Sequence, residues 1–163
     1  MKKLLLSLLL VFMVVSLAAC GGNSNNAGGN VEGDLPTLMT ELYAGIDAEN
    51  LPMLGQMEVT DETFAWILGT EEGFTVDGVK EALVSEPMIS AIAHTVLLVR
   101  MEEGADVETA KKAIKDNVNP RKWICVGVED EKNVIVDSRG DLIVLIMENT
   151  HAQTIHKNFK NLK

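Results

Sequence analysis

The sequence predicts a single α+β domain, with a small, mostly antiparallel sheet packed by helices, behind a signal peptide and a flexible tether. Three observations predict this class. Segment 94–101 holds β-branched residues and leucines in a continuous run, typical of a strand covered on both faces. Apolar residues recur at helical spacing between positions 107 and 118. Short strand-like runs around a glycine turn, and a final amphipathic helix, then mix strands with helices toward the C-terminus.

The first nineteen residues have the layout of a secretory signal peptide. Lys2 and Lys3 supply a positive start, and the following run is apolar as far as Val15, apart from Ser7. From Leu4 to Ala19 the run covers sixteen residues, whereas a helix that spans a bilayer needs about twenty. We therefore expect residues 1–19 to be a signal peptide rather than a permanent membrane span.

The end of that run, Leu17-Ala18-Ala19-Cys20, resembles the lipobox of bacterial lipoproteins. The resemblance implies cleavage between Ala19 and Cys20 and a diacylglyceryl group on the Cys20 thiol. It also implies an extracytoplasmic protein whose partner is the lipid bilayer. Two acyl chains suit an anchor, because each buried CH₂ contributes about 0.8 kcal/mol and one chain alone binds only marginally. The alternative is a cysteine that follows an ordinary signal by chance.

Residues 20–33 form the predicted tether, and residues 34–163 the compact domain. The tether is rich in glycine and asparagine and has, as a coil, a reach of roughly 20 Å. The 130 residues that follow are enough for one core. With Cys20 lipidated, Cys125 has no internal disulfide partner, and its neighbours Ile124 and Val126 predict a small buried residue.

Acidic residues dominate the first half of the chain. The net charge is −10, and loss of Lys2 and Lys3 with the signal makes it −12. Eleven carboxylates and no Lys or Arg lie between Cys20 and Val79. This sign argues against nucleic-acid binding. It leaves open a protein partner that docks on the acidic half and dissociates in salt.

A calcium site is not predicted. The acidic residues lack the D-x-[DN]-x-[DN]-G spacing of a calcium loop, so a solvated face is the simpler interpretation. The residues concerned are Asp61, Glu62, Glu71, Glu72 and Asp77.

The first half of the domain predicts two helices and the central strand. Asp34 and Pro36 are helix-start signals, and the helix ends near Gly45. Residues 60–68 are a second short helix, and residues 94–101 the central strand. The first helix is inferred from the spacing of Leu35, Leu38 and Leu42.

In the second half, Asp106 is the predicted cap of a helix that Asn119-Pro120 ends, with a Glu108–Lys112 pair on its outer side. Strands are predicted at residues 123–128, 134–136 and 142–147, and a last helix capped near Asn149 or Thr150. Its inward face holds Ala152, Ile155, Phe159 and Leu162, and that of the earlier helix Val107, Ala110, Ile114 and Val118.

Arg139-Gly140-Asp141, the tripeptide that integrin-binding proteins display, is interpreted as a hairpin turn, because glycine and polar residues suit such turns. Trp123 is the one aromatic residue that could be exposed, although a core position is favoured. The other mature aromatic residues are expected mainly in the core: Tyr43, Phe64, Trp66, Phe74 and Phe159.

Catalytic motifs are absent from the mature sequence: it has no G-x-S-x-G, H-E-x-x-H, C-x-x-C, P-loop or G-x-G-x-x-G. His94 opens the apolar strand, where a structural histidine is expected. His151 and His156 are five residues apart, about 140° around a helix, and do not suit one metal ion.

Two segments of the second half, VRMEEGADVETAKKAIKDNV and GDLIVLIMENTHAQTIHKNF, resemble the bacterial lipoprotein family catalogued as domain of unknown function 4358. The resemblance covers residues 94–159 and implies a short, lipid-anchored, extracytoplasmic protein, with no activity or catalytic residue to carry over.

These observations predict a membrane-anchored, non-enzymatic binding module of the cell envelope, with no cofactor and no metal. Its partner besides the bilayer is an envelope protein or a small ligand. Two alternatives stay open: an envelope hydrolase that uses scattered carboxylates, and a structural lipoprotein with a protein partner.

Overall fold

The computed structural model describes residues 29–163. The predicted signal peptide, cleavage point and lipidated Cys20 lie outside the described residues. No helix between residues 29 and 163 is long and apolar enough to cross a membrane.

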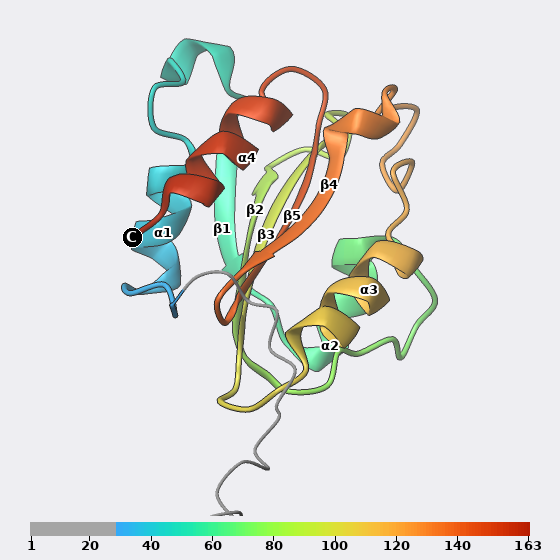
Figure 1. Cartoon of the computed structure of the whole chain (residues 1–163). Coiled ribbons are helices and arrows are strands. Elements are labelled where there is room, and N and C mark those ends of the chain that lie inside the picture. The colour runs from blue at the N-terminus through green and yellow to red at the C-terminus, as the bar shows by residue number, and fades with distance from the viewer. Residues whose placement is uncertain (1–28) are drawn as a thin grey trace, which may run out of the picture.

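A five-stranded antiparallel sheet, in the order β1-β2-β3-β5-β4, forms the centre of the fold. Helices α1 and α4 cover one face, and α2 and α3 cover the other (Figure 1). The predicted α+β class is confirmed. The strands are β1 (Leu54–Glu58), β2 (Val79–Pro87), β3 (His94–Met101), β4 (Val134–Arg139) and β5 (Leu142–Glu148), and the helices α1 (Leu35–Leu42), α2 (Asp61–Leu68), α3 (Val107–Asn117) and α4 (Ala152–Asn161).

Strands β3 and β5 are buried along their whole length, which confirms the prediction made for β3 from the apolar run of residues 94–101. Because side chains alternate across a sheet, Leu97 and Val99 enter the core under α2 and α3, and Val96 and Leu98 the core under α1 and α4. The central strand pair therefore contributes to two separate cores.

The predicted helix starts are confirmed for three of the helices. Asp34 accepts a hydrogen bond from Thr37 N, and Asp106 one from Thr109 N, so each carboxylate caps its helix. Thr60 precedes α2 as its cap. Helix α4 begins one to two residues later than expected, with His151 at the cap position, where Glu148 accepts hydrogen bonds from the backbone N–H groups of Thr150 and His151. The predicted inward face of α4 is buried.

The predicted strand at residues 123–128 is wrong, and this segment is an irregular loop. Cys125 has a positive φ of 62°, which interrupts any extended run. Ile124 N donates to Ser90 O and Val128 N to Pro120 O, so these amides bind loop carbonyls instead of a neighbouring strand. Cys125 is consequently exposed rather than buried, which corrects the prediction for this residue.

Two further details differ from expectation. Glu108 pairs with Lys111 rather than Lys112, at 2.7 Å, and Lys112 pairs instead with Asp116 one turn further on. Strands β1 and β2 were not predicted, because their polar and charged residues interrupt the apolar pattern.

The segment that leads into α1 is held against the end of the sheet. Val31 is buried, and the buried Arg100 guanidinium donates from Nη1 to Val31 O at 2.7 Å and from Nη2 to Gly33 O at 2.7 Å. Arg100 also pairs with Asp141 at 3.0 Å. Of the residues that the structure describes, Val31 is the first that is buried, and it lies within the predicted tether.

Gly140 forms the predicted turn between β4 and β5, with a positive φ of 58°. A Cβ at Gly140 would lie 2.6 Å from Gly29 O, so only glycine lets the N-terminal segment cross this turn. Arg139 Nη1 donates to Lys160 O, and Asp141 binds Arg100. Both charged side chains of the Arg-Gly-Asp tripeptide are thus engaged within the fold.

We expect Arg100→Ala to lower the free energy of unfolding by about 3 kcal/mol, because it leaves Asp141 and two backbone carbonyls without their buried partner. Urea denaturation measures this loss. Glu81→Gln is the matched control: Glu81 is 46% exposed, so its pair with Arg100 should contribute under about 1 kcal/mol. Equal losses of stability in the two variants would contradict the role of the Arg100 side chain in holding Val31 and Gly33.

Candidate functional site

The large exposed apolar side chains come from segments that lie next to one another. Met88 N donates to Met53 O at 3.1 Å, and Ile124 N to Ser90 O at 3.1 Å, which ties together the segments around β1, the β2–β3 loop and the loop after α3. Trp66 of α2 lines one cleft with Met88 and Ile89. We call the following residues the apolar surface: Met53, Met57, Trp66, Met88 and Ile89.

The cleft beside Trp66 has a volume of about 490 Å³. Trp66 and the β2–β3 loop form its walls, and Trp123 and the Glu86–Lys122 pair also line it. Trp66 is 61% exposed and Met88 70% exposed. Such large apolar side chains in the open, grouped around a concave site, are typical of a binding surface.

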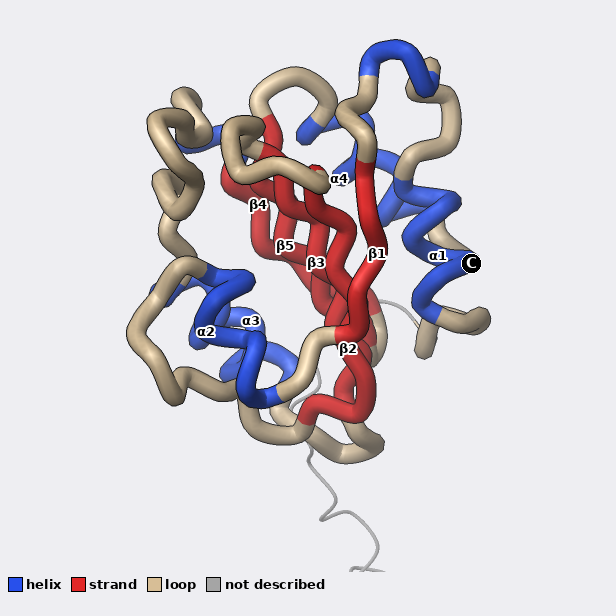
Figure 2. The backbone as a smooth tube through the Cα atoms, turned by 180° about the vertical axis from the view of Figure 1, so that it is seen from behind, coloured by secondary structure: helices blue, strands red, loops and turns tan. Residues whose placement is uncertain are grey.

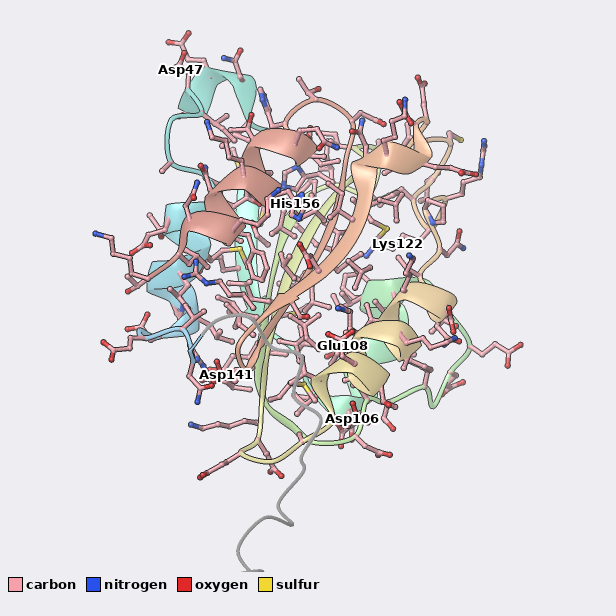
Figure 3. The ribbon with its side chains drawn as sticks, viewed as in Figure 1. Asp47, Asp106, Glu108, Lys122, Asp141 and His156 are labelled. Carbon is pink, nitrogen blue, oxygen red and sulfur yellow. The ribbon has the colours of Figure 1, made fainter. Side chains whose placement is uncertain are left out.

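Lys122 and Glu86 form an ion pair in this cleft, with side chains only 7% and 14% exposed. Lys122 Nζ also donates to Ile67 O at 2.6 Å, and Glu86 Oε1 accepts a second hydrogen bond from the Thr95 hydroxyl. Burial lowers the pKa of Lys122, and the nearby Glu86 charge opposes this effect. Figure 3 shows Lys122 beside the upper end of α3, far from Asp141 at the other end of the sheet.

The two indole rings enclose the lysine. Its Nζ lies 5.4 Å from the ring centroid of Trp66 and 5.4 Å from that of Trp123, within the range of a cation–π interaction. The space between the rings is thus filled by a cation of the protein itself. A ligand would meet the outer, apolar side of Trp66, rather than an aromatic cage open to a cation.

Gly69 allows the loop after α3 to approach α2 this closely. It ends α2 with a positive φ of 68°, and a Cβ there would lie 2.4 Å from Lys122 Cβ. Asn119 N donates to Leu68 O at 2.8 Å, next to this contact. The end of α2 therefore positions both Trp66 and Lys122.

Cys125 and Trp123 line a second hollow, of about 590 Å³. The hollow is formed largely by the irregular loop at residues 121–129, together with Ala93 and Asn149. Trp123 itself is buried, as the sequence favours. It lines both hollows.

On the opposite face of the sheet, His94 is buried at the start of β3. Its Nε2 lies 2.8 Å from the Tyr43 hydroxyl, and the two rings stack with centroids 5.9 Å apart. Burial lowers the pKa of His94 to about 4; the Glu148 charge opposes this shift and His151 adds to it. Burial also raises the pKa of Tyr43. Within the described chain, His94 Nδ1 and His151 Nε2 are buried without a hydrogen-bond partner.

The histidines of the last helix do not converge. His156 Nε2 lies 2.7 Å from Asp137 Oδ2, whereas His151 precedes the helix beside Glu148. Burial alone would raise the pKa of Asp137, but its hydrogen bonds from His156 and Ser138 N lower it. Between residues 29 and 163 no group of three or more His, Cys, Asp or Glu side chains is placed to hold a metal ion. The acidic residues considered for calcium are exposed: Asp61, Glu62, Glu71, Glu72 and Asp77.

Trp66 is the residue of this site that sequence reasoning assigned to the core. Phe64, Ile67 and Leu68 are buried on one side of α2, and at 100° per residue Trp66 lies on the other side. The helical position of this tryptophan was therefore the available signal.

Comparison of the chain with protein-family models, curated proteins and solved structures finds no match.

We expect the stability of the fold to fall as the pH drops from 6.5 to 4. His94 has a pKa of about 4 in the fold against 6.5 in the unfolded chain, so the unfolded state binds the proton first. The stabilisation is complete above pH 6.5, and its loss amounts to about 3 kcal/mol at 1.36 kcal/mol per pKa unit. Urea denaturation across this range should show a shallower fall for His94→Gln, and parallel profiles would contradict the assignment.

Proposed function

We propose that the protein is a lipid-anchored, extracytoplasmic binding module that holds an apolar group of another envelope component in the cleft beside Trp66. The observation that carries this proposal is the grouping of exposed Trp, Met and Ile side chains around one cleft. Tryptophan and methionine are enriched at interfaces, and tryptophan is frequent among the residues that dominate binding energy.

The chemistry of the cleft supports binding rather than turnover. The Lys122 ammonium is engaged by Glu86, by Ile67 O and by two aromatic rings. An amine needs to be free and deprotonated to act as a nucleophile or base. The site thus combines a buried ion pair with exposed apolar side chains above it, which suits recognition of an apolar group.

The lipobox-like Leu17-Ala18-Ala19-Cys20 supports the anchor. We expect the intact mass of the native protein to include a diacylglyceryl group, and the protein to fractionate with membranes, whereas Cys20→Ser should lose both properties. Cys125→Ser is the matched control and should keep both, because Cys125 lies in a loop of the folded domain. If the native protein and Cys20→Ser behave alike without added lipid mass, the anchor is refuted.

The binding role is tested by a photoreactive amino acid placed at Met88 in the full chain within cells. We expect a discrete cross-linked product from position 88 and none from Lys157, an exposed residue of α4 on the opposite face. Trp66→Ala should reduce the product roughly tenfold or more, since truncation of a central tryptophan commonly weakens binding by about 2 kcal/mol. Equal products from positions 88 and 157 would sink the proposal.

A further inference from the structure

Strand β1 is an open edge of the sheet next to the apolar surface. In the part of the chain that the structure describes, it is hydrogen bonded to β2 alone, and Figure 2 shows it at one side of the sheet. Gln56, Met57 and Glu58 are exposed. An exposed edge strand presents unpaired N–H and C=O groups, which makes it a template for another strand.

The register identifies which backbone groups are available. Val59 N donates to Ala82 O at 2.9 Å, and Met88 N donates to Met53 O at 3.1 Å. Positions 53 and 59 therefore turn their backbone groups toward β2, and in an antiparallel pair alternate residues do so. The N–H and C=O groups of Leu54, Gln56 and Glu58 consequently face away from the sheet.

The side chains of β1 alternate in the same way. Met57 is opposite Val84, which enters the core under α2 and α3, so Met57 lies on the face that carries the Trp66 cleft. Gly55 is on this face as well, and the Met88 sulfur lies 3.2 Å from where its Cβ would be. The apolar surface thus extends along one face of β1. Glu58, opposite Leu83, lies on the other face.

The charge around β1 is the second feature of this edge that a partner would recognise. Glu58, Asp61 and Glu62 are exposed at the end of β1 and the start of α2, and residues 29–79 contain no Lys or Arg. Lys80 lines the same hollow as Glu58, but Glu58 forms no ion pair with any described residue. This edge is complementary to a basic segment. A second copy of the chain would bring the same carboxylates to the same edge.

We propose that the occupant is an extended segment of a partner protein that adds to β1 as a further strand, with apolar and basic residues in alternation. Its apolar side chains lie over the methionine side of β1 toward the cleft, and its Lys or Arg side chains lie on the Glu58 side. This mode of binding takes affinity from backbone hydrogen bonds and specificity from alternate side chains. The inference rests on the proposed function, whose apolar group becomes one side chain of this segment.

The test uses the full-length protein in lipid nanodiscs and a fluorescein-labelled peptide of alternating valine and lysine, followed by anisotropy. Gln56→Pro removes one outward N–H and no hydrogen bond to β2, because the backbone of Gln56 faces away from the sheet. Gln56→Ala is the matched control and keeps the N–H. We expect the peptide to bind the wild type and Gln56→Ala alike, and Gln56→Pro roughly tenfold more weakly.

Two modified peptides test the wild-type protein directly, which keeps the proposal falsifiable if Gln56→Pro does not fold. One is N-methylated at the lysine amides and the other at the valine amides. Since alternate residues of an added strand face β1, only one of the two should lose binding. A peptide in which glutamate replaces lysine should not bind.

Several results would overturn the strand addition: no binding of the valine–lysine peptide, binding of the glutamate peptide, or equal binding by both methylated peptides. A dimer that Gln56→Pro dissociates would assign the edge to a second copy. Adsorption of Cys20→Ser to phosphatidylcholine vesicles that the peptide does not displace would assign the apolar surface to a bilayer. A cross-link at Met88 that depends on Trp66 but not on the Gln56 N–H would overturn this inference and leave the proposed function standing.

Discussion

Complete burial of two adjacent strands is the constraint on which the rest of the fold depends. β3 and β5 are covered on both faces, so the chain must supply a layer of helices to each side. Phe64 and Ile114 come from one layer, and Met39 and Phe159 from the other. The sheet separates the helices of one layer from those of the other (Figure 1), so each layer packs against its own face of the central strands.

The outer strands are under less constraint, and the candidate site lies there. β1 pairs with β2 on one side only, and the loops at residues 88–93 and 119–128 meet beyond the end of α2. Because the central strands already provide the core, side chains such as Met88 and Trp66 are free to remain exposed. The buried Lys122–Glu86 pair keeps this region ordered without filling its apolar rim.

The sequence correctly predicted the elements whose apolar side chains are buried. The rule behind these predictions is that an apolar residue at regular spacing belongs to the core. The run at residues 94–101 and the inward face of α4 follow that rule. The caps Asp34 and Asp106 were predictable for a different reason, since a carboxylate there accepts a hydrogen bond from the first turn of the helix. The rule failed where apolar residues are exposed. Ile124 and Val126 suggested a strand and Trp66 a core position, but all three are exposed, and Val126 and Trp66 line the two hollows. β1 was not predicted from the sequence because an edge strand with glycine and exposed polar residues has little apolar alternation. The errors therefore concentrate at the candidate site, where function and burial differ.

The hydrogen bonds from Arg100 to Val31 O and Gly33 O also fix the place at which the N-terminal segment reaches the domain. The N-terminal segment reaches the fold at the end of the sheet where Arg100 and Asp141 meet, whereas Glu86 and Thr95 lie toward the start of β3. With the proposed anchor at Cys20, eight residues lie between the lipidated cysteine and Gly29, and this connection spans at most about 32 Å when fully extended. The cleft lies roughly one strand length, about 26 Å, along the sheet from this point of attachment. A partner in the same bilayer would therefore have to present its exposed strand within the distance that this span and the strand length set together.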